Sequence, residues 1–335
     1  MQPDPRLPEF LRAHGLAGPG DRVRWTPLTG GVASDIWRVD VNDSSLCVKC
    51  ALPKLRVARD WYAPTSRNGY EWAWMKFAFG HLPESVPRPL AHDPGIGAFA
   101  MSFLDGATHP VWKSKLLAGH ADPDFARGVG ARLGRLHAAS AGDPAVRGAF
   151  PTDDIFQSIR LEPYLIAAAQ AHPDLGTVLR DMAKDTLGTH KALVHGDISP
   201  KNILVGPSAP VFLDAECAWY GDPAFDLAFC LNHFLLKCLF RPDRRDGFLR
   251  CFEVFTDGYL EKVDWEPAAD LEERAARLLP ALLLARIDGK SPVEYVTETS
   301  QKDLVRQVAR PLISRPRRHL AEIAAAWRGA LARKT

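Results

Sequence analysis

The chain lacks an apolar run long enough to cross a bilayer. Crossing takes about 20 consecutive apolar residues, and the longest apolar stretch, Leu278–Ile287, is interrupted by Pro280 and Arg286. The opening residues MQPDP also lack the basic and apolar regions of a secretory signal. We therefore expect a cytoplasmic protein with no membrane partner.

The chain also has little net charge and few cysteines. The 42 basic and 40 acidic residues leave a net charge of +2, so no bulk field draws the chain to nucleic acid, and we expect no such partner. The six cysteines are scattered, and a chain of this size needs no disulfides to complete its core. Cys47 and Cys50 form a C-x-x-C pattern in a predicted strand. Their side chains would point to opposite faces, which argues against a metal site.

Hydrophobic periodicity divides the chain into a strand-rich part and a helical part. A short helix over 8–16 precedes strands predicted at 25–28, 35–41, 45–51 and 99–104, with a helix over 70–79 and a Pro-rich connection over 83–94 between the last two. Afterwards only two short strands are expected, near 203–205 and 211–214; helical patterns cover 124–140, 157–170, 175–185, 225–239, 247–261, 269–287 and 300–331. The pattern indicates an α+β protein with an N-terminal lobe over 1–104 and a helical lobe over 105–335.

Three polar residues stand out in the segments HGDISPKNILV and VFLDAE, which begin at residues 195 and 211. Asp197 is followed five residues later by Asn202, and Asp214 ends an apolar strand. Phosphoryl transfer from ATP needs a carboxylate that orients and deprotonates the accepting hydroxyl, and hard oxygen ligands for Mg²⁺. Asp197 suits the first role, and Asn202 and Asp214 suit the second.

These segments resemble the aminoglycoside phosphotransferase, choline kinase and methylthioribose kinase family, over roughly residues 21–290. The shared features are His-Gly-Asp, four residues and Asn, followed by Leu-Asp-x-Glu. The resemblance implies a bilobal protein-kinase-like fold with a small antiparallel-sheet lobe and a large helical lobe, with ATP and Mg²⁺ as cofactors. It also makes Glu216 a further Mg²⁺ ligand, direct or through water. Asp214-Ala215-Glu216 replaces the Asp-Phe-Gly of protein kinases.

The loop between the first two predicted strands reads LTGGVASD and suits phosphate binding, with Gly30, Gly31 and Ser34 as candidates. By itself a Gly-Gly pair is more often only a hairpin turn. The position of this loop, one hairpin before Lys49, favours the phosphate-binding interpretation. In kinases such a lysine binds the α- and β-phosphates and pairs with a helix glutamate, for which Glu71 is the candidate; Lys54 is the alternative lysine.

The strand ending in FAMSFLDG resembles the family's connection between lobes. The resemblance implies that the Ser102 carbonyl and the Leu104 N–H bind adenine. Backbone recognition leaves no side-chain signature, so ATP and GTP are not distinguished.

Several residues near the main motif have two possible interpretations. Ser199 would bind the γ-phosphate or stabilise the turn before Pro200. Asp226 suits a helix N-cap, and the resemblance implies that it also braces the catalytic loop. Trp219 and Tyr220 would line the acceptor pocket or pack in the core. We expect a structural role for His195 and assign none to Lys201.

The acceptor is the least determined part of the prediction. Arg286, Asp288 and Lys290 break a helical pattern and resemble the substrate side of methylthioribose kinase; an ordinary helix end with surface charges is the alternative. Residues 226–335 carry 19 basic and 16 acidic side chains, which gives no acidic bias for a polycationic aminoglycoside, although the segment 261–264 would supply a local one. A sugar-like metabolite alcohol is favoured.

Other functions remain open at this level. They are an aminoglycoside-type antibiotic phosphotransferase, a choline-type kinase and a nucleotide-binding pseudokinase with a regulatory role. A protein-serine kinase is disfavoured because Asp-Phe-Gly is missing and only about a dozen residues separate Asp214 from the next helix. The oligomeric state is not predicted.

Overall fold

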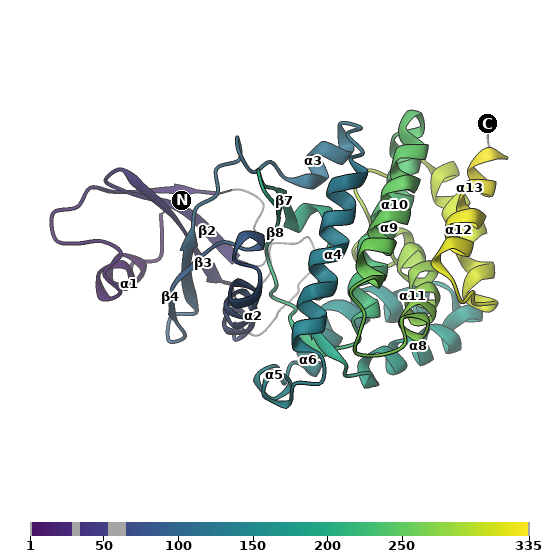
Figure 1. Ribbon diagram of the computed structural model, residues 1–335, viewed down its shortest axis with the longest axis horizontal. Helices are drawn as coiled ribbons and strands as arrows, with labels where there is room; N and C mark the ends of the chain where they lie inside the picture. The colour runs from purple at the N-terminus through teal and green to yellow at the C-terminus, as the bar shows by residue number, and fades with distance from the viewer. Residues whose placement is uncertain (1, 29–33, 53–64, 334–335) are drawn as a thin grey trace.

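The computed structural model describes residues 2–28, 34–52 and 65–333. Figure 1 shows two lobes, with the sheet at one end and the helices at the other. The sheet is antiparallel, in the order β1-β2-β3-β5-β4. Its strands are β1 (Val23–Pro27), β2 (Ser34–Val41), β3 (Ser44–Ala51), β4 (Pro89–Asp93) and β5 (Ala98–Ser102).

One strand of this sheet was not predicted. Residues 83–94 were expected to form only a Pro-rich connection, but they contain a short 3-10 turn, η1 (Pro83–Ser85), and then β4. Pro89 stands at the start of β4, which is an edge strand, and an edge position tolerates the missing N–H donor of proline.

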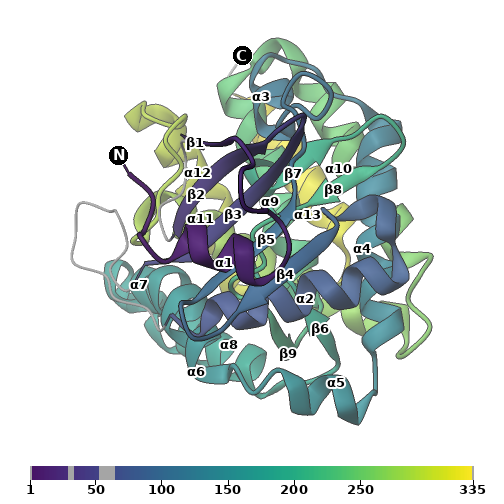
Figure 2. The same cartoon turned by 90° about the vertical axis from the view of Figure 1, so that its left-hand side faces the viewer.

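Two helices cover the two faces of the sheet. On one face, α1 (Leu7–Ala13) packs its apolar residues against Val48 and Ala100. On the other face lies α2 (Arg67–His81), beside β3, β4 and β5 (Figure 2). Cys50 faces α1, so strand alternation places Cys47 and Lys49 on the α2 side. The predicted separation of the two cysteines is confirmed, and both are free thiols.

The helical lobe is built around α9 (Ala224–Phe240), which is buried along nearly its whole length. Against it pack α10 (Arg245–Leu260) and α11 (Ala268–Asp288), while α4 (Pro123–Ser140) lies along α10. The helix expected over 300–331 is instead two helices, α12 (Thr299–Ser314) and α13 (Leu320–Ala332). Pro316 lies between them, where proline cannot continue a helix.

Shorter elements complete this lobe. The helix predicted over 157–170 is a π-helical segment, η2 (Gln157–Ile166), followed by α7 (Ala167–Ala171). The helix expected over 175–185 is α8 (Gly176–Gly188). The remaining elements are α3 (Trp112–Leu117), α5 (Pro144–Ala149), α6 (Asp153–Phe156), η3 (Pro173–Leu175), η4 (Pro200–Asn202) and η5 (Pro242–Arg244).

Two small antiparallel sheets position the segments that carry Asp197 and Asp214. One pairs β6 (Ala192–Val194) with β9 (Trp219–Gly221), and the other pairs β7 (Ile203–Val205) with β8 (Pro210–Phe212). The predicted strands at 203–205 and 211–214 correspond to β7 and β8. The loop with Asp197 leaves β6, and the segment with Asp214 leaves β8, so the two small sheets bring both motifs to one place.

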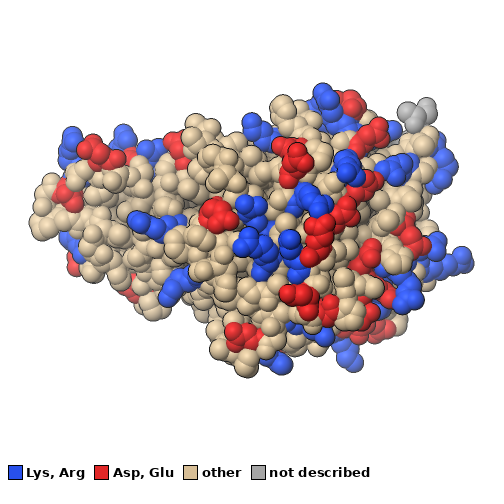
Figure 3. Space-filling view, in the orientation of Figure 1, with Lys and Arg blue, Asp and Glu red and all other residues tan. Residues whose placement is uncertain are grey.

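The connection between the lobes runs over residues 103–111 and joins β7 through a bridge from Val111 to Leu204. The predicted boundary between the two lobes, at residues 104 and 105, stays a prediction. No helix within the described ranges combines the length and apolarity that a membrane span requires. Basic and acidic side chains are intermixed over the face of the helical lobe seen in Figure 3.

Candidate active site

The loop that carries Asp197 is fixed to α9 by a buried carboxylate. Asp226 accepts hydrogen bonds from the N–H groups of His195 at 2.7 Å and Gly196 at 2.9 Å. Gly196 has a φ of +78°, and a Cβ there would lie 2.6 Å from the Cys217 carbonyl oxygen, so only glycine fits. The bracing implied by the family resemblance is therefore present.

The prediction that Asp226 caps a helix is wrong. Helix α9 begins at Ala224, and Asp226 lies inside its first turn. Asp222 supplies the local bond instead, since its Oδ1 accepts from the Ala224 N–H at 3.0 Å. The fully buried Asp226 fixes the loop that carries Asp197 rather than its own helix end.

His195 links the two motif segments. Its Nε2 donates to the Leu213 carbonyl oxygen at 3.1 Å, and its Nδ1 accepts from the Asp197 N–H at 3.2 Å. Burial lowers the pKa of His195, which suits a neutral ring with one donor and one acceptor. This is the structural role expected for His195.

The Asp197 carboxylate is held by two cations through the same oxygen. Its Oδ2 lies 2.8 Å from an Arg160 guanidinium nitrogen and 3.1 Å from Lys201 Nζ. Burial alone would raise the pKa of Asp197, but Arg160 and then Lys201 outweigh it and lower the pKa. Among the described residues, its Oδ1 has one hydrogen-bond partner, the Ser199 hydroxyl 3.5 Å away. An ionised carboxylate with one nearly free oxygen is the result.

Arg160 was missed at the sequence level. It lies on η2, is buried, and also donates to the carbonyls of Gly196 and Ile159. No motif surrounds it. In the sequence it stands between Ile159 and Leu161 in a helical segment that also contains polar residues, so nothing marks it as buried.

Asn202 and Asp214 offer hard oxygens beside this carboxylate. The Asn202 amide donates to the Asp197 carbonyl oxygen at 3.1 Å, which leaves its own side-chain oxygen as an acceptor. Asp214 has a φ of +67°, a left-handed conformation that Asp tolerates better than most residues. Within the described part of the chain no cluster of three or more His, Cys, Asp or Glu side chains suits a metal ion. Mg²⁺ usually takes one or two carboxylates plus phosphate oxygens, so the Asn202–Asp214 pair still fits it.

A buried lysine joins the sheet lobe to this segment. Lys49 Nζ lies 2.7 Å from Glu71 Oε1 and forms a second ion pair with Asp214. Burial opposes the charge on Lys49, yet Asp214 and Glu71 outweigh it and raise its pKa. Burial raises the pKa of Glu71 to about 7. The predicted pairing of Lys49 with Glu71 is thus present, with Asp214 as an unforeseen third member.

A second cross-lobe pair lies next to the first. Arg67, at the start of α2, places its Nε 3.0 Å from Glu216 Oε2 and donates to the Leu52 carbonyl oxygen at 2.7 Å. Glu216 therefore has one oxygen engaged by a cation, and its role as a Mg²⁺ ligand stays a prediction.

The remaining nucleotide-side candidates are only partly described. Gly30, Gly31 and Lys54 lie outside the described residues, and Ser34 is buried at the start of β2. The Ser102 N–H donates to the Arg88 carbonyl oxygen at 2.9 Å, whereas the Leu104 N–H makes no hydrogen bond within the described ranges. Adenine binding by Ser102 and Leu104 stays a prediction.

A cavity of about 190 Å³ opens onto Asp197, Ser199 and Lys201. Residues of α9, of the end of α11 and of the segment after α11 line it. The other residues that line it are Lys113, Tyr164, Pro200, Phe229, His233, Lys237, Arg286, Ser291, Pro292, Glu294 and Tyr295. It includes none of Lys49, Glu71 or Asp214, the ion-paired residues that we call the Lys49 network. Asp197 lines the cavity and is also close enough to Asp214 for the two charges to interact.

Two of the three predicted residues at the end of α11 are not part of this cavity. Arg286 lines it, as expected. Asp288 instead pairs with Arg306 at 2.6 Å and with His172 at 2.9 Å, and Lys290 is exposed to solvent. Side chains along a helix end point in different directions, and only Arg286 has the direction that reaches the cavity.

Trp219 and Tyr220 also need correction. Trp219 is fully buried and stacks on Phe156 with 4.1 Å between ring centroids. Tyr220 is buried and donates its hydroxyl to the Lys191 carbonyl oxygen at 3.0 Å. Neither lines the cavity beside Asp197. The alternative interpretation, core packing, describes both residues.

The acidic segment considered for an aminoglycoside lies elsewhere. Glu261 pairs with Arg127, and Glu261 and Asp264 border a separate hollow that also contains Arg135 and Lys262. They add no negative charge to the cavity with Asp197.

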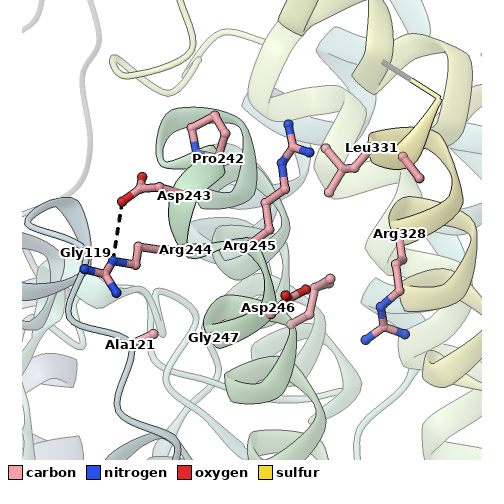
Figure 4. Close-up of a pocket in the computed structure, with 12 residues that line it drawn as sticks. Gly119, Ala121, Pro242, Asp243, Arg244, Arg245, Asp246, Gly247, Arg328 and Leu331 are labelled. Atoms are coloured by element: carbon pink, nitrogen blue, oxygen red, sulfur yellow. Dashed lines mark ion pairs between the residues drawn. The ribbon is translucent and has the colours of Figure 1, made fainter. Parts of the chain in front are cut away.

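A larger hollow, of about 630 Å³, lies between the start of α10 and α13. Figure 4 shows Arg245 and Asp246 on one side, Arg328 on the other, and the ion pair of Arg244 with Asp243. It contains no residue of the catalytic motif. Size alone therefore does not identify the candidate site.

A lysine of the sheet lobe paired with a helix glutamate, above a helical lobe that presents Asp197, Asn202 and Asp214, defines the protein-kinase-like class of fold. Within this class, the model of the phosphotransferase enzyme family matches residues 24–251, well over half of the chain. The chain belongs to the phosphotransferase enzyme family, as the sequence motifs had suggested.

Similar proteins refine this placement. The methylthioribose kinase of Enterobacter sp. (strain 638) is 24% identical over 254 residues, which cover 67% of this chain and 62% of that protein. The methylthioribose kinase of Cronobacter sakazakii is 26% identical over 223 residues, 58% of this chain and 55% of that protein. The matches thus span less than two thirds of the length of these relatives.

Solved structures agree on the fold. An amicoumacin kinase superposes with a TM-score of 0.54 at 14% identity, covering 88% of this chain and 90% of that one. A spectinomycin phosphotransferase gives 0.52 at 14% identity, covering 98% and 99%. At this identity the likeness supports the two-lobed kinase-like fold and nothing finer.

Proposed function

We propose that this protein transfers the γ-phosphate of ATP to a hydroxyl group of a small polar acceptor. The observation that carries the proposal is the position of Asp197, which lines a closed-in cavity on one side and adjoins Asn202 and the Lys49–Glu71–Asp214 network on the other. The amicoumacin kinase was solved with AMP-PNP and Ca²⁺, and the spectinomycin phosphotransferase with ADP, which supports a nucleotide on the network side.

Lys49 would bind the α- and β-phosphates, held in place by Glu71. The Leu104 N–H and the Ser102 carbonyl would bind adenine. Gly30, Gly31, Ser34 and Ser199 complete the proposed phosphate contacts.

Asn202 and Asp214 would hold Mg²⁺, and Glu216 would join them if Arg67 yields one carboxylate oxygen. The ion would neutralise charge on the β- and γ-phosphates. The protein's own contribution is to fix these oxygens: the Asn202 amide through the Asp197 carbonyl oxygen, and Asp214 through Lys49.

Asp197 would orient the acceptor hydroxyl and take its proton. Because Arg160 and Lys201 hold Oδ2, the free Oδ1 is the oxygen that accepts the hydroxyl hydrogen. The acceptor O–H bond breaks, its oxygen bonds to the γ-phosphorus, and the bond from that phosphorus to the bridging oxygen of ADP breaks. A lowered pKa makes Asp197 a weak base, which suffices because a loose transition state requires mainly positioning.

The curated relatives named methylthioribose kinase favour a sugar-like metabolite as the acceptor. An aminoglycoside antibiotic is less favoured, because the acidic segment 261–264 is not part of the cavity. A regulatory pseudokinase has no need of Asp197 with a free oxygen. The cytoplasmic location and the absence of nucleic-acid and membrane partners stay predictions.

The test is Mg-ATP turnover with a panel of sugars, sugar acids, methylthioribose, choline and aminoglycosides, with products identified by mass spectrometry. Asp197→Asn is the inactive variant and Lys290→Met, at an exposed lysine, is the matched control. Product that forms with the wild type and Lys290→Met but not with Asp197→Asn supports the proposal. A protein that does not bind Mg-ATP contradicts it.

A further inference from the structure

The charges that line the cavity do not balance. Besides the carboxylate of Asp197 it contains that of Glu294, and its cations are Lys113, Lys201, Lys237 and Arg286. Glu294 pairs with Lys113, and Asp197 pairs with Lys201 and Arg160. Lys237 and Arg286 have no carboxylate within 4.0 Å among the described residues. Both acidic groups are thus engaged, and two cations remain without a counter-charge.

Lys237 is the more exceptional of the two. It is 1% exposed, and the printed contacts of its Nζ in the described part of the chain are with a neutral side chain: the Tyr295 hydroxyl lies 3.5 Å from Nζ and the Tyr295 ring centroid 4.5 Å. Burial lowers the pKa of Lys237 to about 7, and Lys113 contributes to the shift. A buried cation without a counter-charge is costly for the folded protein, so its presence in a cavity indicates a ligand that supplies the charge.

A second unpartnered group lies one helical turn away. His233 is 6% exposed, and its Nε2 has no hydrogen-bond partner in the part of the chain that is described. Its Nδ1 lies 3.3 Å from the Tyr295 hydroxyl. Burial and the nearby cations lower the pKa of His233, so a neutral ring that accepts from Tyr295 has a free N–H donor at Nε2. The buried Nε of Arg286 is likewise unpartnered.

His233 and Lys237 lie successively farther along α9 from the end of the cavity that holds Asp197. Phe229, His233 and Lys237 are four residues apart on α9, so Lys237 stands about 12 Å along the helix axis from Phe229. Phe229 lies at the Asp197 end, because its ring is 5.9 Å from the guanidinium of Arg160. An acceptor whose hydroxyl is at Asp197 therefore has its far end beside His233 and Lys237.

We propose that the acceptor is a small polyhydroxy compound with an anionic group, a carboxylate or a phosphate, bound by Lys237, Arg286 and the His233 Nε2–H. The inference rests on the proposed function and names its substrate class. A cavity of about 190 Å³ is smaller than the roughly 300–1,000 Å³ of drug-sized sites, which suits a sugar acid or sugar phosphate. Choline and aminoglycosides would bring like charge to unpaired cations.

Four hexose-sized probes separate charge from shape: glucose, glucosamine, gluconate and glucose 6-phosphate. Each is titrated into the full-length protein with Mg-ADP present, by calorimetry. We expect gluconate or glucose 6-phosphate to bind at least about tenfold more tightly than glucose, and glucosamine to bind most weakly. The two anions also distinguish a carboxylate from a phosphate.

The matched variants are Lys237→Met, which removes the charge and keeps an unbranched apolar side chain, and Lys290→Met, which removes an exposed lysine outside the cavity. Lys237→Met should lose about tenfold or more in affinity for the anionic probe, with glucose unchanged. Lys290→Met should bind every probe like the wild type. Thermal unfolding of each variant checks that it is folded.

The inference would be overturned by equal binding of glucose and the anions, by no binding of either anion, or by unaltered anion affinity in Lys237→Met. A loss of Mg-ATP affinity in Lys237→Met equal to the loss for the anion would also overturn it, because the cations would then belong to the nucleotide. In any of these cases Asp197-dependent transfer to a neutral acceptor would leave the proposed function intact, whereas failure to bind Mg-ATP would remove that function itself.

Discussion

The buried cations on the two sides of Asp197 differ in whether they have acidic partners. On the side of the sheet lobe, the two buried cations that the structure describes have acidic partners: Lys49 has Glu71 and Asp214, and Arg67 has Glu216. On the cavity side, the partners of Lys237 and Arg286 within the described residues are neutral. The first arrangement is complete without a ligand and holds the two lobes in register. The second is incomplete, so it is the side on which a ligand's charge has most influence.

The largest effect is expected at the point where the two sides meet. Asp197→Asn should lower the rate of phosphoryl transfer by roughly 10²–10⁴-fold, the usual range for a lost general base. Mg-ATP affinity should change little, because Asp197 is not part of the Lys49 network. Single-turnover kinetics with labelled ATP measure the step, and an unchanged rate would remove Asp197 from the chemistry.

Removing the cation of the Lys49 network should lower the free energy of unfolding. Lys49→Met leaves Glu71 and Asp214 without their cation, and removing one partner of a buried pair typically costs about 3–5 kcal/mol. Urea unfolding measures this loss. Lys49→Met combined with Glu71→Leu should recover part of it, because one unpaired carboxylate is then gone. If Lys49→Met is as stable as the wild type, the ion pairs of Lys49 with Glu71 and Asp214 do not contribute to the free energy of unfolding as we expect.

The cavity side should respond in the opposite direction. Lys237→Met removes a buried cation that lacks a carboxylate, so the free energy of unfolding without ligand should rise. The effect should depend on pH, because the folded-state pKa of about 7 lies below the unfolded value near 10.4. Between these values the unfolded chain binds more protons, so the wild type gains stability as pH rises.

The gain in the wild type relative to Lys237→Met is on the order of 3 kcal/mol between pH 7 and pH 10. Lys113, Arg286, Glu294, His233 and Tyr295 surround this lysine and are common to both proteins, so the difference isolates Lys237. Chemical denaturation at a series of pH values measures it. Parallel pH dependences for the two proteins would mean that Lys237 is not an uncompensated charge.

The smallest effect concerns the basicity of Asp197. Arg160 is the larger of the two influences that lower its pKa, so Arg160→Met should raise that pKa and move the acid limb of the kcat/KM profile to higher pH. Arg160→Lys should restore part of the shift, which a purely structural defect would not do. An acid limb at the wild-type position in Arg160→Met would show that Arg160 holds the loop without tuning the carboxylate.

The sequence predicted one side of the site better than the other. Asp197, Asn202, Asp214 and the Lys49–Glu71 pair belong to motifs whose chemistry requires specific residues at fixed spacings, so a single chain reveals them. Lys237, His233 and Arg160 belong to no motif. They converge only because η2, α9 and the end of α11 pack together, and a buried lysine in an apolar helix resembles an ordinary helix residue in the sequence.

The same distinction explains the errors. Trp219 and Tyr220 follow the motif closely, but β9 pairs with β6 and turns both into the core. Asp288 and Lys290 are neighbours of Arg286, yet only Arg286 has the helical phase that reaches the cavity. Edge strand β4 was missed because its pairing with β5, not its own Pro-rich sequence, makes it a strand.

The most direct test of the account is ³¹P NMR of the full-length protein with Mg-ATP and, in separate samples, gluconate, glucose 6-phosphate, glucose and glucosamine. The account predicts a new phosphate-ester signal with an anionic acceptor in the wild type and none with Asp197→Asn. No Asp197-dependent ester in any sample, together with no binding of Mg-ATP, would contradict it.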